Sequence, residues 1–166
     1  MAAGSTYTPI ATTTLGSAAS SYTFTGISSA YTDLILVATT PPSAGGSVNL
    51  TMGNGSIDTG TNYSWTYLRG NGTAASSSRG STDSRIFSGE NATAGLQSNL
   101  IIHFQNYSNT TTYKTCISRY NCTDTVTQAT VGLWRSTSAI NQIRLAIGGD
   151  SFAAGATFTL YGIAAA

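Results

Sequence analysis

Hydrophobic and polar residues alternate with a period of two along most of this chain of 166 residues. Alternation of this kind is typical of a β-strand that buries one face, because successive side chains point to opposite sides. It predicts strands over residues 21–27, 34–37, 48–52, 63–67, 85–87, 100–104, 113–120, 130–134, 140–147 and 157–163. The segment 34–37 is a continuous apolar run, which predicts a strand covered on both faces, and 100–104 is a second core run.

Clusters of Gly, Asn, Ser and Asp separate the apolar runs, and no segment keeps the period of a helix. The pattern therefore predicts an all-β fold, an antiparallel jelly-roll-like β-sandwich of about eight to ten strands. The length fits one domain, which we place at residues 21–166. Residues 1–20 are rich in Ala, Ser and Thr and are predicted to be an N-terminal arm, either a disordered tail or a segment that packs on a partner.

Two segments are predicted to be loops. Residues 41–46 (PPSAGG) are expected to form a turn between two core strands, because proline cannot donate a hydrogen bond to a sheet. The segment from Arg69 to Arg85 is rich in Gly and Ser and also contains Arg79. Loops of this length are functional or disordered, so it is either a freely exposed loop or an arm that becomes ordered against a neighbouring subunit.

The chain carries little charge. Only 8% of the residues are charged, and the formal net charge is +1. A nucleic-acid-binding surface needs clustered basic residues, and here they are few and scattered, so the composition argues against that class. Weak repulsion between copies suits a protein that works in an ordered assembly.

The start of the chain has no secretory signal and no window is apolar enough to span a membrane, so we expect assembly in a reducing cytoplasm.

The inventory of reactive side chains argues against catalysis. His103 is the only histidine and Glu90 the only glutamate, so an acid–base pair would have to come from scattered aspartates. Cys116 and Cys122 are expected to be free thiols, and their spacing lacks the second pair of ligands that zinc needs. A Cys–His pair would require one of these thiols beside His103. We therefore predict that the protein is not an enzyme and has no catalytic residues, metal or cofactor.

Recognition is the remaining class of function. Residues 63–67 place Tyr63, Trp65 and Tyr67 on one side of a strand, where they either fill the core or form a platform for a sugar ring or a subunit. Several other large side chains near strand ends or in the long loop are expected to be exposed interface residues. These candidates are Arg69, Arg79, Arg85, Tyr107, Tyr113, Tyr120, Trp134 and Arg135.

Residues 136–163 read STSAINQIRLAIGGDSFAAGATFTLYGI, an alternating strand, a Gly/Asp/Ala loop and a second alternating strand. This resembles the C-terminal end of bacteriophage virion-surface proteins, in which a TSAIN-x-IR strand precedes a strand of the LYGI type. SSAYTDLILV at residues 28–37 and TNYSW at residues 61–65 resemble earlier strands of the same module. The resemblance covers roughly residues 22–163 and implies a structural or adhesive protein of the particle.

The leading hypothesis is a capsid decoration or cement protein on the virion surface, made and assembled in the host cytoplasm. Its expected partners are the major capsid protein and its own copies, as a homotrimer, because closed symmetric assembly is the usual habit of oligomers. The alternative is a tail-fibre or tail-tip module that binds a host surface glycan. The two hypotheses differ in copy number and in whether the Tyr63–Trp65–Tyr67 row faces solvent.

Overall fold

A computed structural model describes residues 6–41, 45–123 and 125–164, and within these residues every regular element is a β-strand. The strands are β1 (Tyr7–Thr14), β2 (Ser21–Phe24), β3 (Asp33–Thr39), β4 (Gly45–Asn54), β5 (Ser56–Ile57), β6 (Tyr63–Gly70), β7 (Ala75–Asp83), β8 (Ile86–Thr93), β9 (Ser98–Gln105), β10 (Lys114–Cys122), β11 (Val126–Trp134), β12 (Gln142–Gly148) and β13 (Thr157–Ile163). Every predicted strand is present, and the all-β prediction is confirmed. No helix in the described part of the chain could cross a membrane.

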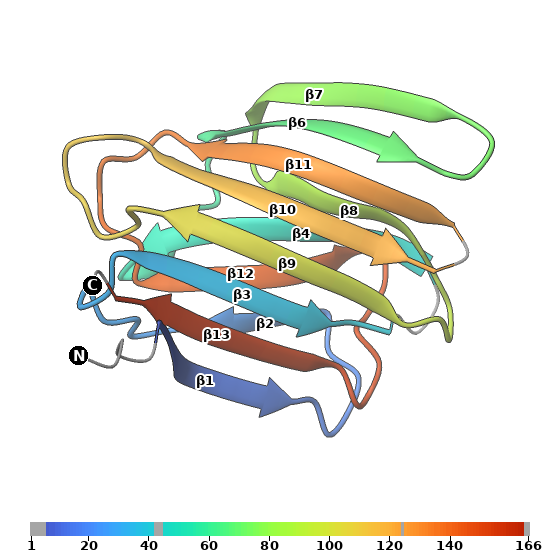
Figure 1. Ribbon diagram of the computed structural model, residues 1–166, viewed down its shortest axis with the longest axis horizontal. Helices are drawn as coiled ribbons and strands as arrows, with labels where there is room; N and C mark the ends of the chain where they lie inside the picture. The colour runs from blue at the N-terminus through green and yellow to red at the C-terminus, as the bar shows by residue number, and fades with distance from the viewer. Residues whose placement is uncertain (1–5, 42–44, 124, 165–166) are drawn as a thin grey trace.

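The strands form two antiparallel sheets that pack face to face (Figure 1). The large sheet has eight strands in the order β1-β13-β3-β9-β10-β11-β6-β7. The small sheet has five strands, in the order β2-β12-β4-β5, and β8 also pairs with β4, along the edge that faces away from β12. Figure 1 shows the large sheet in front of the small one. The predicted antiparallel β-sandwich is therefore correct.

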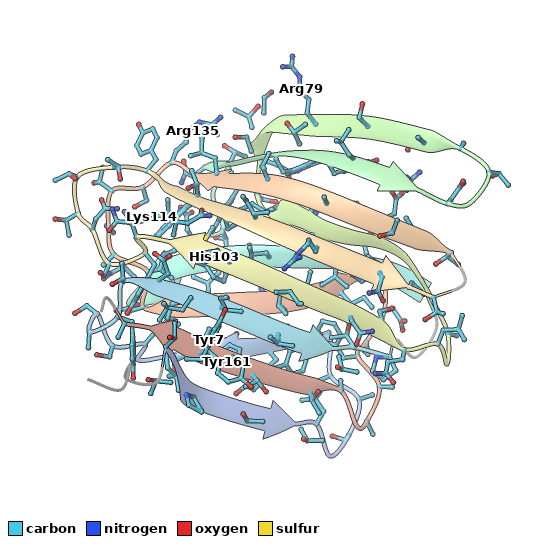
Figure 2. All side chains as sticks on the ribbon, in the orientation of Figure 1. Tyr7, Arg79, His103, Lys114, Arg135 and Tyr161 are labelled. Carbon is cyan, nitrogen blue, oxygen red and sulfur yellow. The ribbon has the colours of Figure 1, made fainter. Side chains whose placement is uncertain are left out.

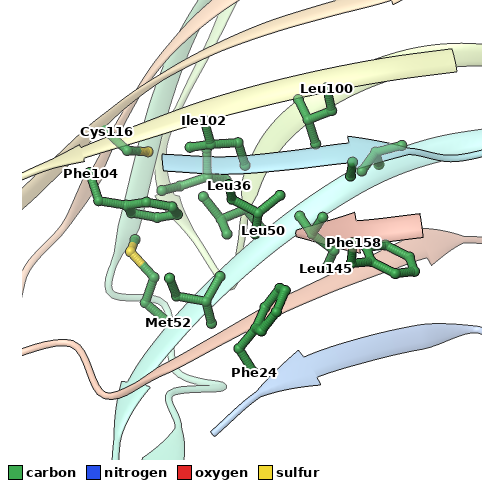
Figure 3. Close-up of a cluster of buried hydrophobic side chains, with 14 of the residues drawn as sticks. Phe24, Leu36, Leu50, Met52, Leu100, Ile102, Phe104, Cys116, Leu145 and Phe158 are labelled. Carbon is green, nitrogen blue, oxygen red and sulfur yellow. The ribbon is translucent and has the colours of Figure 1, made fainter. Parts of the chain in front are cut away.

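The hydrophobic core lies between the two sheets, where alternate side chains of each strand meet. Leu36 and Ile102 of the large sheet and Leu50 and Leu145 of the small sheet are almost completely inaccessible to solvent (Figure 3). Phe158 of β13 closes the cluster, stacking with an interplanar angle of 17° on Tyr22. Side chains buried in this way contribute the main stabilising free energy of the fold.

The prediction that residues 34–37 are covered on both faces is wrong. In β3 and β9 only every second side chain is buried, and Val37 and Ile101 are exposed. The small sheet covers one face of these strands, and no other described segment covers the opposite face.

The predicted arm contains a strand of the sandwich. Residues 7–14 form β1, which pairs with β13 from Tyr7 opposite Ile163 to Thr14 opposite Thr157. This strand was not predicted, because an edge strand rich in Thr has few apolar positions. Residues 1–5 of the predicted arm, and residues 42–44 of the predicted turn at 41–46, lie outside the described residues.

The predicted loop from Arg69 to Arg85 is largely a β-hairpin, which corrects the loop prediction. Strands β6 and β7 pair from Gly70 opposite Ala75 to Tyr63 opposite Asp83. The Asn71 side chain builds the turn: its Oδ1 accepts hydrogen bonds from the backbone N–H groups of Thr73 and Ala74 at 3.1 and 2.8 Å. Asn bonding to backbone two or three residues onward is a common turn device. Because β7 is exposed along almost its whole length, it has no apolar alternation that could mark it as a strand.

Candidate functional site

The face of the large sheet that points away from the small sheet, which we call the outer face, carries exposed aliphatic side chains. Val37 is 36% exposed and Ile101 is 37% exposed, and the two lie directly opposite each other on β3 and β9. Ile117 and Val131 are 47% and 53% exposed and lie opposite each other on β10 and β11. Leu68 of β6 is 68% exposed.

These five side chains form a band across five adjacent strands, which we call the aliphatic stripe. The strand order places β3, β9, β10, β11 and β6 side by side. Directly opposite residues of paired strands share a face, and residues two positions apart in one strand also share it. Single exposed apolar residues are ordinary, but a contiguous group on one face is a feature of interaction sites. The outer face is therefore the main candidate site.

His103 stands on the outer face of β9, opposite Ile35 and Ile117. Its Nε2 lies 3.0 Å from Oδ2 of Asp33. The other oxygen of that carboxylate accepts a hydrogen bond of 2.7 Å from the backbone N–H of Asn106. The pair fixes the orientation of the imidazole ring.

The two thiols lie on the opposite side of the sheet from His103. Cys116 is buried opposite Phe104, and burial raises the pKa of its thiol to about 12. Neither cysteine is part of a disulfide, and both are buried side chains of β10. Six residues of an extended strand span about 20 Å, far more than a disulfide can bridge. The arrangement therefore provides neither a Cys–His pair nor a disulfide.

A groove opens on the outer face at the end where β6, β7, β10 and β11 meet, with a volume of about 540 Å³. Its floor contains Ile117, Val131 and Leu133, and two arginines, Arg79 and Arg135, line it. Figure 2 shows both arginines near the β6–β7 end of the large sheet. Both arginines are among the interface residues predicted from the sequence, but their shared groove was not predicted, because they are far apart in the chain.

The aromatic row of β6 faces the inside of the sandwich. Tyr63 is completely buried. Trp65 stacks on Tyr67 with ring centres 5.6 Å apart, and Phe87 of β8 packs against both rings. The indole N–H of Trp65 also donates a hydrogen bond of 3.0 Å to Asp83. Tyr63 therefore belongs to the core, whereas Trp65 and Tyr67 are only partly buried.

Three predicted interface residues are buried, so their expected exposure is wrong. The hydroxyl of Tyr107 donates to the backbone oxygen of Ser28, and that of Tyr120 donates to Ser98 at 3.0 Å. The indole N–H of Trp134 donates to Asp58 at 2.8 Å. Each polar tip has a partner inside the protein, so a position near a strand end did not keep these rings in water.

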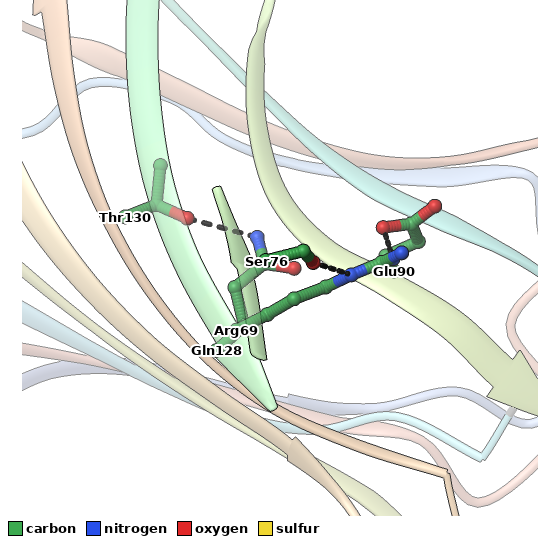
Figure 4. Close-up of polar contacts among 5 residues, drawn as sticks. All are labelled: Arg69, Ser76, Glu90, Gln128 and Thr130. Atoms are coloured by element: carbon green, nitrogen blue, oxygen red, sulfur yellow. Dashed lines mark hydrogen bonds and ion pairs between the residues drawn. The ribbon is translucent and has the colours of Figure 1, made fainter. Parts of the chain in front are cut away.

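The other candidates occupy different surroundings. Tyr113 is 54% exposed, and Arg79 and Arg85 are exposed as well. Arg69 points between the sheets, where it forms an ion pair with Glu90 and its Nε donates to Ser76 at 3.0 Å (Figure 4). This arginine joins β6 to β8 and does not belong to the outer face.

No cluster of three or more His, Cys, Asp or Glu side chains in the described ranges could hold a metal ion. The expectation that the protein has no cofactor stays a prediction.

The comparisons with known proteins do not assign the chain to a family. No protein-family model matches it, and no curated protein matches it in sequence. Among solved structures, a galectin of Caenorhabditis elegans has 9% identity and a TM-score of 0.37, covering 93% of this chain and 96% of the galectin. An alginate lyase from Aplysia kurodai has 9% identity and the same TM-score of 0.37, over 82% of this chain and 70% of the lyase. A sucrose-6-phosphate hydrolase from Lactobacillus gasseri has 16% identity and a TM-score of 0.36; the match covers 88% of this chain but only 28% of the hydrolase.

Proposed function

We propose that the protein is a structural protein of a bacteriophage particle, a decoration or cement subunit that binds the capsid through its outer face. The aliphatic stripe is the observation that carries this proposal, because the rest of the described chain leaves these five aliphatic side chains uncovered on one face. The resemblance of residues 136–163 to virion-surface proteins supports the choice of a phage particle. The low charge of the chain supports a role in an assembly.

The size of the stripe indicates a weak contact per copy. Fully burying an exposed Val, Ile or Leu contributes about 1.5–3 kcal/mol, and the five stripe side chains are about half exposed, so together they give roughly 4–7 kcal/mol. The loss of translational and rotational freedom on association costs about 4–15 kcal/mol. The stripe alone therefore binds weakly, and stable attachment needs additional contacts or several linked copies.

Linked copies would supply such multivalency. In this proposal the subunits form a homotrimer and contact neighbouring capsid proteins together, so that each added contact benefits from the others. The function is then mechanical: apolar area buried across capsomer boundaries resists the pressure of the packaged DNA.

The alternative, a tail module that binds host glycans, has less support from the geometry. Sugar rings pack against exposed aromatic faces. Here Tyr63 is buried, and Trp65 and Tyr67 stack on each other and on Phe87. The stripe consists of aliphatic side chains, which suit contact with another protein better than contact with a sugar.

The first test is the copy number of the protein relative to the major capsid protein in purified particles, measured by quantitative mass spectrometry. A decoration protein is expected to be present in hundreds of copies. A count limited to the low symmetry of a tail would overturn the proposal and favour the alternative.

A second test changes the stripe itself. Val37→Ser combined with Ile101→Ser removes two neighbouring stripe side chains, and the variant should sediment less with particles than the parent protein. Ala146→Ser, on the outward side of β12 in the small sheet, is the matched control and should bind normally. Equal binding of both variants, with unchanged thermal unfolding, would contradict docking through the outer face.

A further inference from the structure

The groove at the β6–β7 end of the outer face has the composition of an anion-binding site. Its lining includes Arg79 and Arg135 and contains no Asp or Glu residue. The whole chain has only seven basic residues, so two of them in one groove are a notable concentration. With a volume of about 540 Å³, the groove falls in the size range of ligand sites.

Arg135 is held in place before any ligand arrives. Its backbone N–H donates to the backbone oxygen of Asn62 at 2.8 Å. Its Nη2 donates to Oγ of Ser64 at 3.2 Å and to the backbone oxygen of Ser81 at 2.9 Å. A side chain that is already ordered loses little entropy when it binds, which favours affinity.

The guanidinium of Arg135 still has unused donors. Its Nη1 is shielded from solvent and has no hydrogen-bond partner among the described atoms. A shielded donor without an acceptor is unfavourable, and the carboxylate of a bound ligand would supply an acceptor. Arginine and carboxylate form short, strong, often paired hydrogen bonds.

The carboxylates near this end of the sheet are engaged elsewhere. Asp83 of β7 accepts hydrogen bonds from the Trp65 indole at 3.0 Å and from the Ser84 backbone at 2.7 Å. Asp58 accepts from Trp134 at 2.8 Å and from Asn62 at 2.8 Å. Neither lines the groove, and among the described residues no carboxylate forms an ion pair with Arg79 or Arg135.

The floor of the groove indicates which other groups the anionic ligand carries. Ile117, Val131 and Leu133 are aliphatic, and hydroxyl groups line the groove beside them. Trp65 is the one aromatic residue of the lining, and its ring already stacks on Tyr67 and packs on Phe87. An extended peptide that alternates acidic and aliphatic side chains fits both the arginines and this floor, whereas a sugar lacks an open aromatic face to stack on.

We propose that this groove binds an acidic peptide segment of the protein on which the subunit docks, with Arg79 and Arg135 holding a carboxylate over the aliphatic floor. The inference rests on the proposed function for the identity of that partner. The bound peptide segment supplies a contact in addition to the aliphatic stripe and fixes the orientation of the subunit on the particle.

The test uses a short synthetic peptide of alternating Val and Glu with blocked ends, added to the isotope-labelled full chain at low salt. The amide NMR signals of Ser64, Thr66 and Ser81 should shift progressively. A peptide with Gln in place of Glu should bind at least about tenfold more weakly, the size expected for loss of a charged hydrogen bond. Arg79→Gln combined with Arg135→Gln should weaken binding by a similar factor, and Arg85→Gln, outside the groove, should not.

Arg135 also holds Ser64 and Ser81, so the double variant could lose structure. Arg79→Gln alone provides the safeguard, because this side chain is exposed and its removal should weaken binding with unchanged thermal unfolding. Peptide affinity that is equal in the parent protein and in Arg79→Gln would overturn the role of the arginine pair.

A second probe, an oligosaccharide of uronic acids, separates the two classes of partner. Shifts of the groove amides with the saccharide but not with the peptide would overturn the peptide proposal and favour the glycan-binding alternative. No shift with either probe would also overturn it. The proposed function would then still be tested independently by Val37→Ser and Ile101→Ser, since neither residue lines the groove.

Discussion

Tyr63→Phe removes one oxygen atom from the protein interior and should destabilise the fold measurably. The hydroxyl lies at the end of β6 and reaches the small sheet, where it accepts a hydrogen bond of 3.0 Å from the backbone N–H of Met52. It lies 2.9 Å from the backbone oxygens of Met52 and of Asp58, to which it can donate. The side chain is fully buried, and burial raises the pKa of Tyr63 far above its usual value of 10.0.

The size of the effect follows from what the phenylalanine leaves behind. The ring still fills its place, so no cavity of the size of a side chain forms. The N–H of Met52 loses its partner, however, and a buried unsatisfied group costs about 1–3 kcal/mol. We expect a loss of about 2 kcal/mol in the free energy of unfolding, which for a domain of this size lowers the melting temperature by about 4–8 °C.

Urea unfolding followed by circular dichroism measures this loss directly, and calorimetry gives the change in melting temperature. Tyr113→Phe is the matched control, because Tyr113 is 54% exposed and should change the free energy by less than about 0.5 kcal/mol. A Tyr63→Phe variant as stable as that control would refute the reasoning, since the hydroxyl would then not join the two sheets.

Three further predictions concern the interior of β10 and its neighbours. Cys116 and Cys122 should not react with a thiol reagent in the folded protein, and both should react after unfolding in urea, because both are buried. Stability should fall in alkali: burial raises the pKa of Cys116 from 9.0 to about 12 and that of Tyr120 from 10.0 to about 12, so the folded state keeps protons that the unfolded chain releases. Their contribution is complete below about pH 9 and is lost as the pH rises toward 12, which urea unfolding across that range would measure. Gly132→Ala should cost about 1–3 kcal/mol in the same unfolding assay, because its new Cβ would meet Ile86 at 2.6 Å and Cys116 at 2.9 Å.

Each of these has a clear contrary result. Rapid reaction of either thiol in the folded state would show that β10 opens readily. Stability that is constant from neutral pH to about pH 11 would mean that the buried thiol and phenol titrate normally. A Gly132→Ala variant of parental stability would mean that Ile86 moves away at little cost, and Gly16→Ala, with open space around its Cβ, provides the comparison.

The alternating pattern was enough to predict the fold class, because a strand with one buried face has apolar residues at every second position. Strand β7 was not predicted, because it lacks this alternation. Its side chains from Ala75 to Asp83 are almost all exposed, so its place in the sheet depends on backbone pairing with β6 and on the turn at Asn71. Backbone pairing does not require particular side chains, so it produces no pattern in the sequence.

The site was harder to predict than the fold. Val37 and Ile101 sit in apolar runs that look the same whether their second face meets another layer of the chain or another molecule. Arg79 and Arg135 line the same groove only because the β6–β7 hairpin pairs with β11 in the large sheet. Tyr107, by contrast, was assigned to the surface because its partner, the backbone oxygen of Ser28, lies far away in the sequence.

The pairing of β1 with β13 has a mechanical consequence. Tyr7 lies opposite Ile163 and Thr8 lies opposite Gly162, so the outermost residues of both strands meet at the same end of the pair. A force that separates these ends would break the hydrogen bonds one pair at a time, as a zipper opens, whereas a force along sheared strands must break many together. Single-molecule pulling through residues 7 and 163 should therefore detach β1 at low force.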